Sequence, residues 1–335
     1  MPVKPSASYP SSAASRDRFV VDRRQPPPRH DPWRYQNVIV EDERVADGRV
    51  ARTATVFLTG RECPWRCVMC DLWRYTVPED TPRGAIPAQV GAAADRLRRE
   101  LLPVSQIKLY NAGSFFDPRA VPEGDYRAIA GALAEFTHVV VESHPALVGD
   151  RVDRWLEALG VQAAPGRAPQ LEVAMGLETV HAAALEQLHK RMTVDQFVDA
   201  ADALRRRGVL VRVFLLIAPP FVATDEQREW LLRSVDKAFD CGASVVTLIP
   251  TRTGNGALDT LSAQGFFRQP TLDDIEHSVD AAFATARGRG RLFVDVWDLE
   301  RFAECPECIN ARRDRLHRMN LEQRILPPIA CATCT

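Results

Sequence analysis

The sequence predicts an α/β protein whose parallel sheet closes, fully or partly, into a barrel. Short apolar, β-branched runs alternate six times with longer stretches of helical periodicity, the pattern of repeated strand–helix units. The runs are almost continuously apolar, as in strands buried on both faces. Periodicity alone leaves an open doubly wound sheet as the alternative. In both folds the functional side lies at the carboxyl ends of the strands.

The elements are expected in the following order. Residues 1–32 are rich in Ser, Pro and Arg, which predicts a disordered tail. A short edge strand is expected at 38–40, and main strands at 53–58, 106–110, 138–141, 171–176, 209–217 and 244–249. Helices are expected between them at 87–102, 125–135, 149–159, 194–207 and 225–239. Thr193 and Gln196 have the spacing of a capping box, and Gly208 ends that helix.

Composition narrows the class of protein. Of the 335 residues, 46% are hydrophobic and 26% are charged, which excludes wholesale disorder, collagen and coiled coil. The net charge of −1 gives no overall attraction to nucleic acid, although the tail holds arginines that could contact a polyanion: Arg16, Arg18, Arg23, Arg24 and Arg29. The first residues show no secretory signal, and no apolar run is long enough to span a membrane. We therefore expect a cytoplasmic protein without membrane association.

Cysteine spacing is the most informative feature. Seven of the eight cysteines fall into three tight groups: Cys63, Cys67 and Cys70; Cys305 and Cys308; Cys331 and Cys334. A chain of this size does not need disulfides to hold a core, so such groups indicate metal binding. Cys241 stands alone and is expected to be a small buried hydrophobe.

The first group, Cys63-Pro-Trp-Arg-Cys67-Val-Met-Cys70, directly follows the first main strand. A closed zinc site needs four ligands, and no fourth Cys or His lies near in the sequence. Three thiolates suit a cubane iron–sulfur cluster with one iron left without a protein ligand and open to a small molecule. The alternative is a set of chance surface cysteines or redox thiols.

This C-x3-C-x2-C loop on a six-fold βα repeat resembles the radical S-adenosylmethionine (SAM) superfamily, whose partial (β/α)6 TIM-like barrel would cover about 53–250. Segments 63–73, 108–118, 142–145, 176–179 and 189–193 resemble the group that contains the elongator catalytic subunit, and within it the radical-SAM subunit of archaeosine synthase and its bacterial relatives. The chain would then divide into a tail (1–32), a core (33–250) and a C-terminal cysteine-rich, metal-binding extension (251–335). One departure is Met69, where many members have an aromatic residue.

The resemblance implies a [4Fe-4S] cluster on the three loop cysteines and reductive cleavage of SAM to a 5′-deoxyadenosyl radical, which abstracts hydrogen from a substrate. It also implies a reductant protein such as a ferredoxin or flavodoxin, and it suggests a tRNA nucleoside as the substrate. Two other readings remain: a non-catalytic zinc-binding module, and an electron-transfer protein, which would make poor use of so large a barrel.

Candidate cofactor residues follow the strands. After the second strand the family often has Gly-Gly-Glu, which receives the methionine ammonium, and this chain has Asn111, Gly113 and Ser114 there without a carboxylate. Their side-chain oxygens or freed backbone carbonyls could accept the same hydrogen bonds, and an ordinary turn is the alternative. Glu178, after the fourth strand, is the preferred ribose ligand. Glu142, after the third, could contact cofactor or substrate.

Both carboxylates could instead be buried and paired with an arginine. Arg212 lies within the apolar fifth strand and needs a partner, because an unpaired buried charge is costly. The carboxylate of the cofactor is one candidate partner, and Glu142 or Glu172 is the other.

The C-terminal cysteines form two CxxC pairs, Cys305/Cys308 and Cys331/Cys334. Four thiolates satisfy either a closed tetrahedral zinc site or a second [4Fe-4S] cluster. Analogy with the family favours the auxiliary cluster. Residues 311–326 between the pairs predict a helix rich in arginine, which could contact RNA phosphates or could be an ordinary solvated face.

Overall fold

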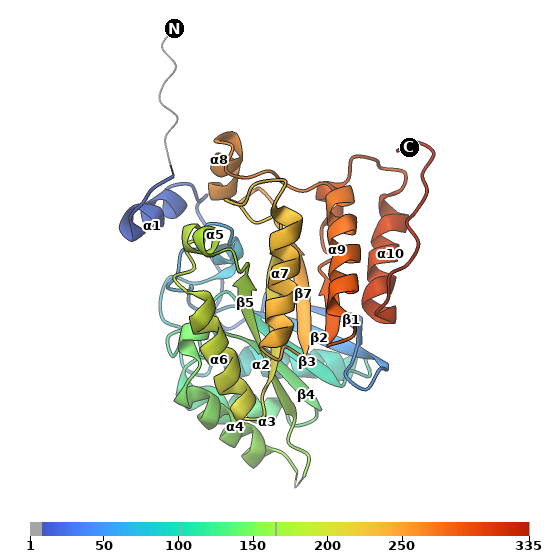
Figure 1. The fold of residues 1–335 in the computed structure, drawn as a ribbon. Coiled ribbons are helices and arrows are strands. Elements are labelled where there is room, and N and C mark those ends of the chain that lie inside the picture. The colour runs from blue at the N-terminus through green and yellow to red at the C-terminus, as the bar shows by residue number, and fades with distance from the viewer. Residues whose placement is uncertain (1–8, 101, 165, 335) are drawn as a thin grey trace.

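The computed structural model describes residues 9–100, 102–164 and 166–334. Eight strands form one curved sheet in which the spatial order equals the chain order (Figure 1). The strands are β1 (Asn37–Arg44), β2 (Val50–Leu58), β3 (Gln106–Asn111), β4 (His138–Glu142), β5 (Gln170–Glu178), β6 (Leu210–Ile217), β7 (Val245–Pro250) and β8 (Arg291–Val294). The β1–β2 pair is antiparallel, and each later pair is parallel. Because β1 and β8 do not pair, the sheet is a partial barrel, as predicted.

The six predicted main strands correspond to β2–β7, and the predicted edge strand is β1. The sequence did not predict β8, which has only four residues and extends the sheet beyond the expected core limit at residue 250. The register aligns the strands so that β2, β3, β4 and β5 end at the same edge, where the Cys63–Cys70 segment begins.

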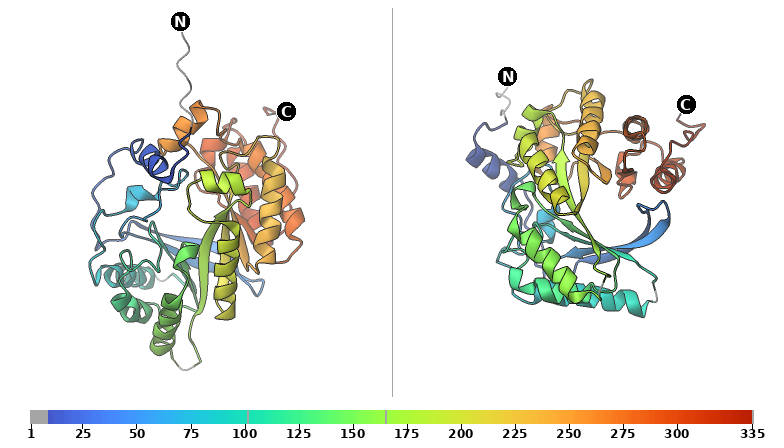
Figure 2. Two further views of the ribbon diagram at one scale, coloured as in Figure 1. Left: turned by 60° about the vertical axis from the view of Figure 1, so that its left-hand side comes forward. Right: turned by 60° about the horizontal axis from the view of Figure 1, so that its bottom comes forward.

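Helices cover the outer face of the sheet (Figures 1 and 2). The five predicted helices are α2 (Ala85–Arg99), α3 (Tyr126–Ala132), α4 (Asp150–Gln162), α6 (Val194–Arg206) and α7 (Gln227–Asp240), and α9 (Leu272–Ala286) joins them. Thr193 and Gln196 form the predicted capping box, and Gly208 has a φ of 71° directly after α6. None of the helices among the described residues is long and apolar enough to cross a bilayer.

The N-terminal segment corrects one prediction. Residues 1–8 lie outside the described residues, but residues 13–21 form α1 (Ala13–Val21), so the predicted disordered tail does not extend to residue 32. Phe19 and Val20 of α1 are buried in an apolar cluster together with Val68, Leu188 and Leu258. This cluster joins α1 to α5 (Ala182–Gln187) and α8 (Ala257–Ala263), which lie together at the upper end of the sheet in Figure 1.

The C-terminal helix α10 (Ile309–Glu322) packs on both edge strands, β1 and β8. The Asn320 amide accepts from the backbone N–H of Val294 and donates to its carbonyl, both at 2.9 Å. The Gln323 amide does the same for Leu292, also at 2.9 Å. Two side chains thus supply the hydrogen bonds that a further strand would make, and they cover an edge that could otherwise pair with another chain.

Candidate functional site

The cysteine loop is attached to the body of the protein at several points. The N–H of Val68 donates to the carbonyl of Leu188, which follows α5, at 3.0 Å. From the loop after β7, the Asn255 amide donates to the Val68 carbonyl at 2.8 Å. The Val68 side chain is fully buried. The loop is therefore fixed by contacts with two βα connections far away in the sequence.

A stacked ring pair lies inside this loop. The Trp65 indole stacks on His144 with ring centroids 3.7 Å apart and planes inclined by 10°. His144 Nδ1 accepts from the backbone N–H of Ala146 at 3.1 Å, so its Nε2–H donates to the Lys190 carbonyl at 3.0 Å. Burial lowers the pKa of His144 to about 4, so the ring is neutral near pH 7. A neutral imidazole at the end of β4 thus supports the stretch of chain between Cys63 and Cys67.

The thiols of Cys63, Cys67 and Cys70 are close enough to affect one another. Burial raises the pKa of all three, to about 12 for Cys70, and the charge of one sulfur further raises the pKa of another. Their sulfur atoms do not gather around one point closely enough for a single ion. In a cubane each cysteine binds a different iron, so these thiols need not converge on a single ion.

The residues expected after β3 and β4 come together. The backbone N–H of Asn111 donates to Glu142 Oε2 at 3.2 Å, and the N–H of His144 donates to Ser114 Oγ at 2.8 Å. A Cβ on Gly113 would lie 2.9 Å from the Arg61 carbonyl oxygen, so only glycine allows this turn to approach the start of the cysteine loop. Burial raises the pKa of Glu142 to about 8, against the weaker effects of the Asn111 N–H and of Lys190.

Glu178 is buried and paired. Its Oε1 accepts from Lys190 Nζ at 2.5 Å, and the two side chains are only 9% and 10% exposed. The expected alternative of a buried carboxylate on a cation is therefore present, with a lysine in place of an arginine. Although burial opposes the charged ammonium, Glu178 and Cys67 raise the pKa of Lys190.

Arg212 requires a correction. Its Nε donates to Glu172 at 2.5 Å and its Nη2 donates to Glu43 of β1 at 2.6 Å, while Lys108 also binds Glu43. Because β1 and β6 are not neighbours in the sheet, this network crosses the interior of the barrel. Arg212 is the third residue of β6, far from the carboxyl end, and its guanidinium is occupied. The predicted contact with a cofactor carboxylate is wrong, and Glu172 is the partner, as in the alternative.

The four C-terminal cysteines form a compact site. The sulfurs of Cys305, Cys308, Cys331 and Cys334 all lie within 4.8 Å of one another, with 4.0 Å between Cys305 and Cys331 and 3.5 Å between Cys308 and Cys334. Within the part of the chain that the structure describes, this is the one such group of Cys, His, Asp or Glu ligands. Cys308 is also the N-cap residue of α10.

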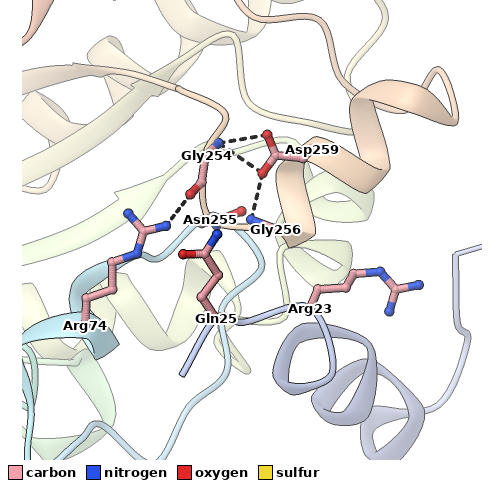
Figure 3. Close-up of a pocket in the computed structure, with 7 residues that line it drawn as sticks. All are labelled: Arg23, Gln25, Arg74, Gly254, Asn255, Gly256 and Asp259. Atoms are coloured by element: carbon pink, nitrogen blue, oxygen red, sulfur yellow. Dashed lines mark hydrogen bonds between the residues drawn. The ribbon is translucent and has the colours of Figure 1, made fainter. Parts of the chain in front are cut away.

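A polar hollow of about 290 Å³ lies beside the loop that carries Asn255 (Figure 3). Arg23 and Gln25 line it from the N-terminal segment, and Arg74 lines it from the 3-10 turn after the cysteines, where its guanidinium donates to the Gly254 carbonyl. Asp259 accepts from the backbone N–H groups of Gly254 and Gly256. The N-terminal segment thus forms one wall of this hollow.

Comparisons with known proteins found relatives in sequence and in fold. No family model matches the sequence. Archaeosine synthase subunit beta of Methanosarcina acetivorans is 27% identical over 238 residues, which cover 68% of this chain and 66% of that protein. An uncharacterized protein of Methanocaldococcus jannaschii is 23% identical over 232 residues, 66% of this chain and 61% of that protein. The matched region is thus less than two thirds of either relative.

Among solved structures, the archaeal Elp3 of Methanocaldococcus infernus has the same fold, with a TM-score of 0.52, 13% identity, and coverage of 70% of this chain and 59% of that one. The chain is thus similar in sequence to archaeosine synthase subunit beta and shares its fold with Elp3. The residues around the cysteine loop can be tested against the [4Fe-4S] cluster and the SAM that the sequence predicts.

The radical SAM cofactors fit the residues present. Three thiols provide the incomplete donor set that leaves one iron free. In the turn that approaches Arg61, both polar atoms of the Asn111 amide are buried without a hydrogen-bond partner. An unpaired buried amide is costly, and the amino and carboxylate groups of a bound methionine moiety would supply both partners.

The sequence did not assign roles to Lys190, Trp65, His144 and Asn255, although the first three lie within motifs that carry the radical SAM resemblance or beside them. The run His189-Lys190-Arg191 was the one sequence signal for these contacts, because three consecutive basic residues after a short helix suggest nearby acidic partners. The partner of Arg191 was less predictable, because it is Asp17 of α1.

Proposed function

We propose that this protein is a radical SAM enzyme that holds a [4Fe-4S] cluster on Cys63, Cys67 and Cys70 and binds SAM beside it. Bound together, these cofactors would supply reductive cleavage of SAM to methionine and a 5′-deoxyadenosyl radical for hydrogen abstraction from the substrate. The observation that carries the proposal is the unpaired, buried Asn111 amide in the turn that approaches the start of the cysteine loop. The relatives and the partial-barrel fold support the same class of enzyme.

In this scheme the protein positions SAM and the cluster and shields them from water. Asn111 would bind the amino or carboxylate group of the methionine moiety, with Glu142 fixing the Asn111 backbone. Trp65 and His144 hold the loop between two cluster cysteines. The apolar residues of α1, α5 and α8 bury Val68 and would keep water away from this side of the [4Fe-4S] cluster.

Anaerobic reconstitution with iron, sulfide and dithionite tests the proposal. We expect a cluster containing four irons on the loop cysteines and formation of 5′-deoxyadenosine from SAM. A well-folded sample that binds zinc at both cysteine sites and no iron would replace this proposal with the non-catalytic zinc-binding module.

For the substrate we propose a nucleoside within RNA, because the curated relative is an archaeosine synthase subunit. On α10, however, most arginines already have acidic partners: Arg312 and Arg315 bind Glu276, and Arg318 binds Glu322. The helix is therefore a poor phosphate-binding face. Retention of tRNA at low salt, measured by filter binding, tests this substrate class. If the protein retains no tRNA, the proposal of an RNA substrate is wrong.

We propose zinc for the C-terminal site, against the auxiliary cluster that family analogy favoured. With a Zn–S bond of about 2.3 Å, the edge of a sulfur tetrahedron is about 3.8 Å. The observed separations of 3.5 and 4.0 Å bracket that value. A cubane would spread four cysteines more widely. Metal analysis of the reconstituted protein should find one zinc and four irons per chain, whereas eight irons without zinc would restore the second cluster.

The electron donor would be a ferredoxin or flavodoxin, since the cluster must receive one electron at a time. All eight cysteines are free thiols in the structure, which is consistent with the reducing cytoplasm. Reduction of the cluster by purified flavodoxin, monitored by the absorption spectrum of the cluster, tests this choice of donor.

A further inference from the structure

The Lys190–Glu178 pair is placed where it gains little for stability. Both side chains are about nine-tenths buried, and the nitrogen–oxygen distance is 2.5 Å. Removing two charges from water costs about as much as their attraction returns, so an apolar pair of similar volume would often stabilise a fold equally well. A buried ion pair of this kind therefore calls for another explanation.

The backbone around the pair is strained. Glu178, His189 and Arg191, which are not glycines, have φ values of 66°, 59° and 56°. Such left-handed residues are costly and persist only when the surroundings hold them, as they do at functional sites. Here Asp17 of α1 holds the loop from outside by accepting from His189 at 2.9 Å and Arg191 at 2.5 Å. These contacts fix the backbone on both sides of Lys190, which lies between His189 and Arg191.

Lys190 is fixed beside the cysteine loop. Its carbonyl accepts from His144, whose ring stacks on Trp65 between two cluster cysteines. Two residues earlier, Leu188 binds the N–H of Val68, the residue after Cys67. The ammonium and the Glu178 carboxylate fill the space above Gly176, where a Cβ would collide with both. The charge of Lys190 therefore acts on the side of the loop that holds Cys63 and Cys67.

We propose that Lys190 is a positioning residue that sets the reduction potential of the cluster, and that Glu178 partly offsets its charge. This inference rests on the proposed function, since it requires the cluster. Reduction transfers one electron from an external one-electron donor to the cluster, whose charge becomes more negative by one. A fixed ammonium in a poorly solvated site stabilises this added charge, and a fixed carboxylate opposes it.

The test is a potentiometric titration of the full-length, reconstituted protein without SAM, followed by the electron paramagnetic resonance signal of the reduced cluster. Lys190→Gln should lower the ratio of reduced to oxidised cluster at a fixed solution potential at least tenfold, a shift of about 59 mV for one electron. Glu178→Gln should raise the ratio. Lys190→Arg, which keeps the charge, should leave it within a factor of three of the wild type.

Lys237→Gln is the matched control, because it removes the same charge from the outer helix α7 and should not shift the potential. The double variant Lys190→Gln/Glu178→Gln should lie between the two single variants. Shifts of both single variants in one direction, or no shift in either at four irons per chain, would overturn the inference while leaving the proposed function intact. If Lys190→Gln loses the cluster, the Glu178→Gln variant decides alone: a raised ratio of reduced to oxidised cluster supports the inference, and a lowered or unchanged ratio overturns it. A wild-type protein without any cluster would overturn both.

Discussion

The two cysteine sites hold their ligands in opposite ways. The C-terminal site brings four sulfurs within 4.8 Å of one another, so the metal itself can tie the chain together. The loop site has only three cysteines, and the chain fixes them by other means: a ring stack on His144 and backbone bonds from Leu188 and Asn255. A complete donor set can serve structure, whereas an incomplete one needs a scaffold around it and leaves a position for chemistry.

The largest expected effect comes from breaking the loop site. In Cys67→Ala the cluster loses a ligand, and we expect 5′-deoxyadenosine formation to fall to background while the free energy of unfolding changes by about 1 kcal/mol. Product assay and urea unfolding measure the two quantities. Cys241→Ala is the control, because this buried cysteine lies outside both sites and its variant should keep all metals. Full activity in Cys67→Ala would contradict the assignment.

Breaking the C-terminal site should show the reverse pattern. Cys308→Ser removes a metal ligand that is also the N-cap of α10, so zinc is lost and the unfolding free energy should fall by about 4 kcal/mol or more. The loop cluster should still assemble. Zinc analysis, iron analysis and thermal unfolding measure these effects. Loss of iron from the loop at unchanged stability would show that the two sites are not separate.

A smaller effect is expected where α10 meets β8. Gln323→Ala leaves the backbone N–H and carbonyl of Leu292 without partners, at a cost of about 1–3 kcal/mol. Hydrogen exchange at Leu292 should become faster, and urea unfolding should show the loss. Asn310→Ala, an exposed position on the same helix, should stay within about 0.5 kcal/mol of the wild type. Equal losses in both variants would argue against a specific role of Gln323.

A further effect concerns the pH dependence of stability at the loop side. The pKa of Glu142 is raised to about 8 in the folded protein, mainly by burial, so the folded state keeps a proton that the unfolded state releases above about pH 4.5. This contribution to stability is present below about pH 4.5 and is lost as the pH rises to 8. Glu142→Gln should therefore gain stability relative to the wild type between pH 5 and 8. A difference that stays constant across that range would contradict the raised pKa.

The sequence could predict the strands because β2–β7 are continuous apolar runs, and the cysteine motif because its spacing is local. It could not predict β8, which is four residues long, or α1, whose buried Phe19 and Val20 lie among Ser and Arg. The partner of Arg212 depended on which strands face each other across the barrel. Nor could CxxC spacing distinguish zinc from a cluster, because that difference lies in the separation of sulfurs from distant parts of the chain.

The amides of Asn320 and Gln323 have a consequence for self-association. They cover the edge of β8 from a helix whose N-cap is Cys308, one of the four cysteines of the proposed metal site. A chelator that strips this metal would loosen the helix and uncover a row of backbone donors and acceptors. An ion bound at these cysteines would thus both order the end of the chain and keep neighbouring molecules from pairing with the edge of β8.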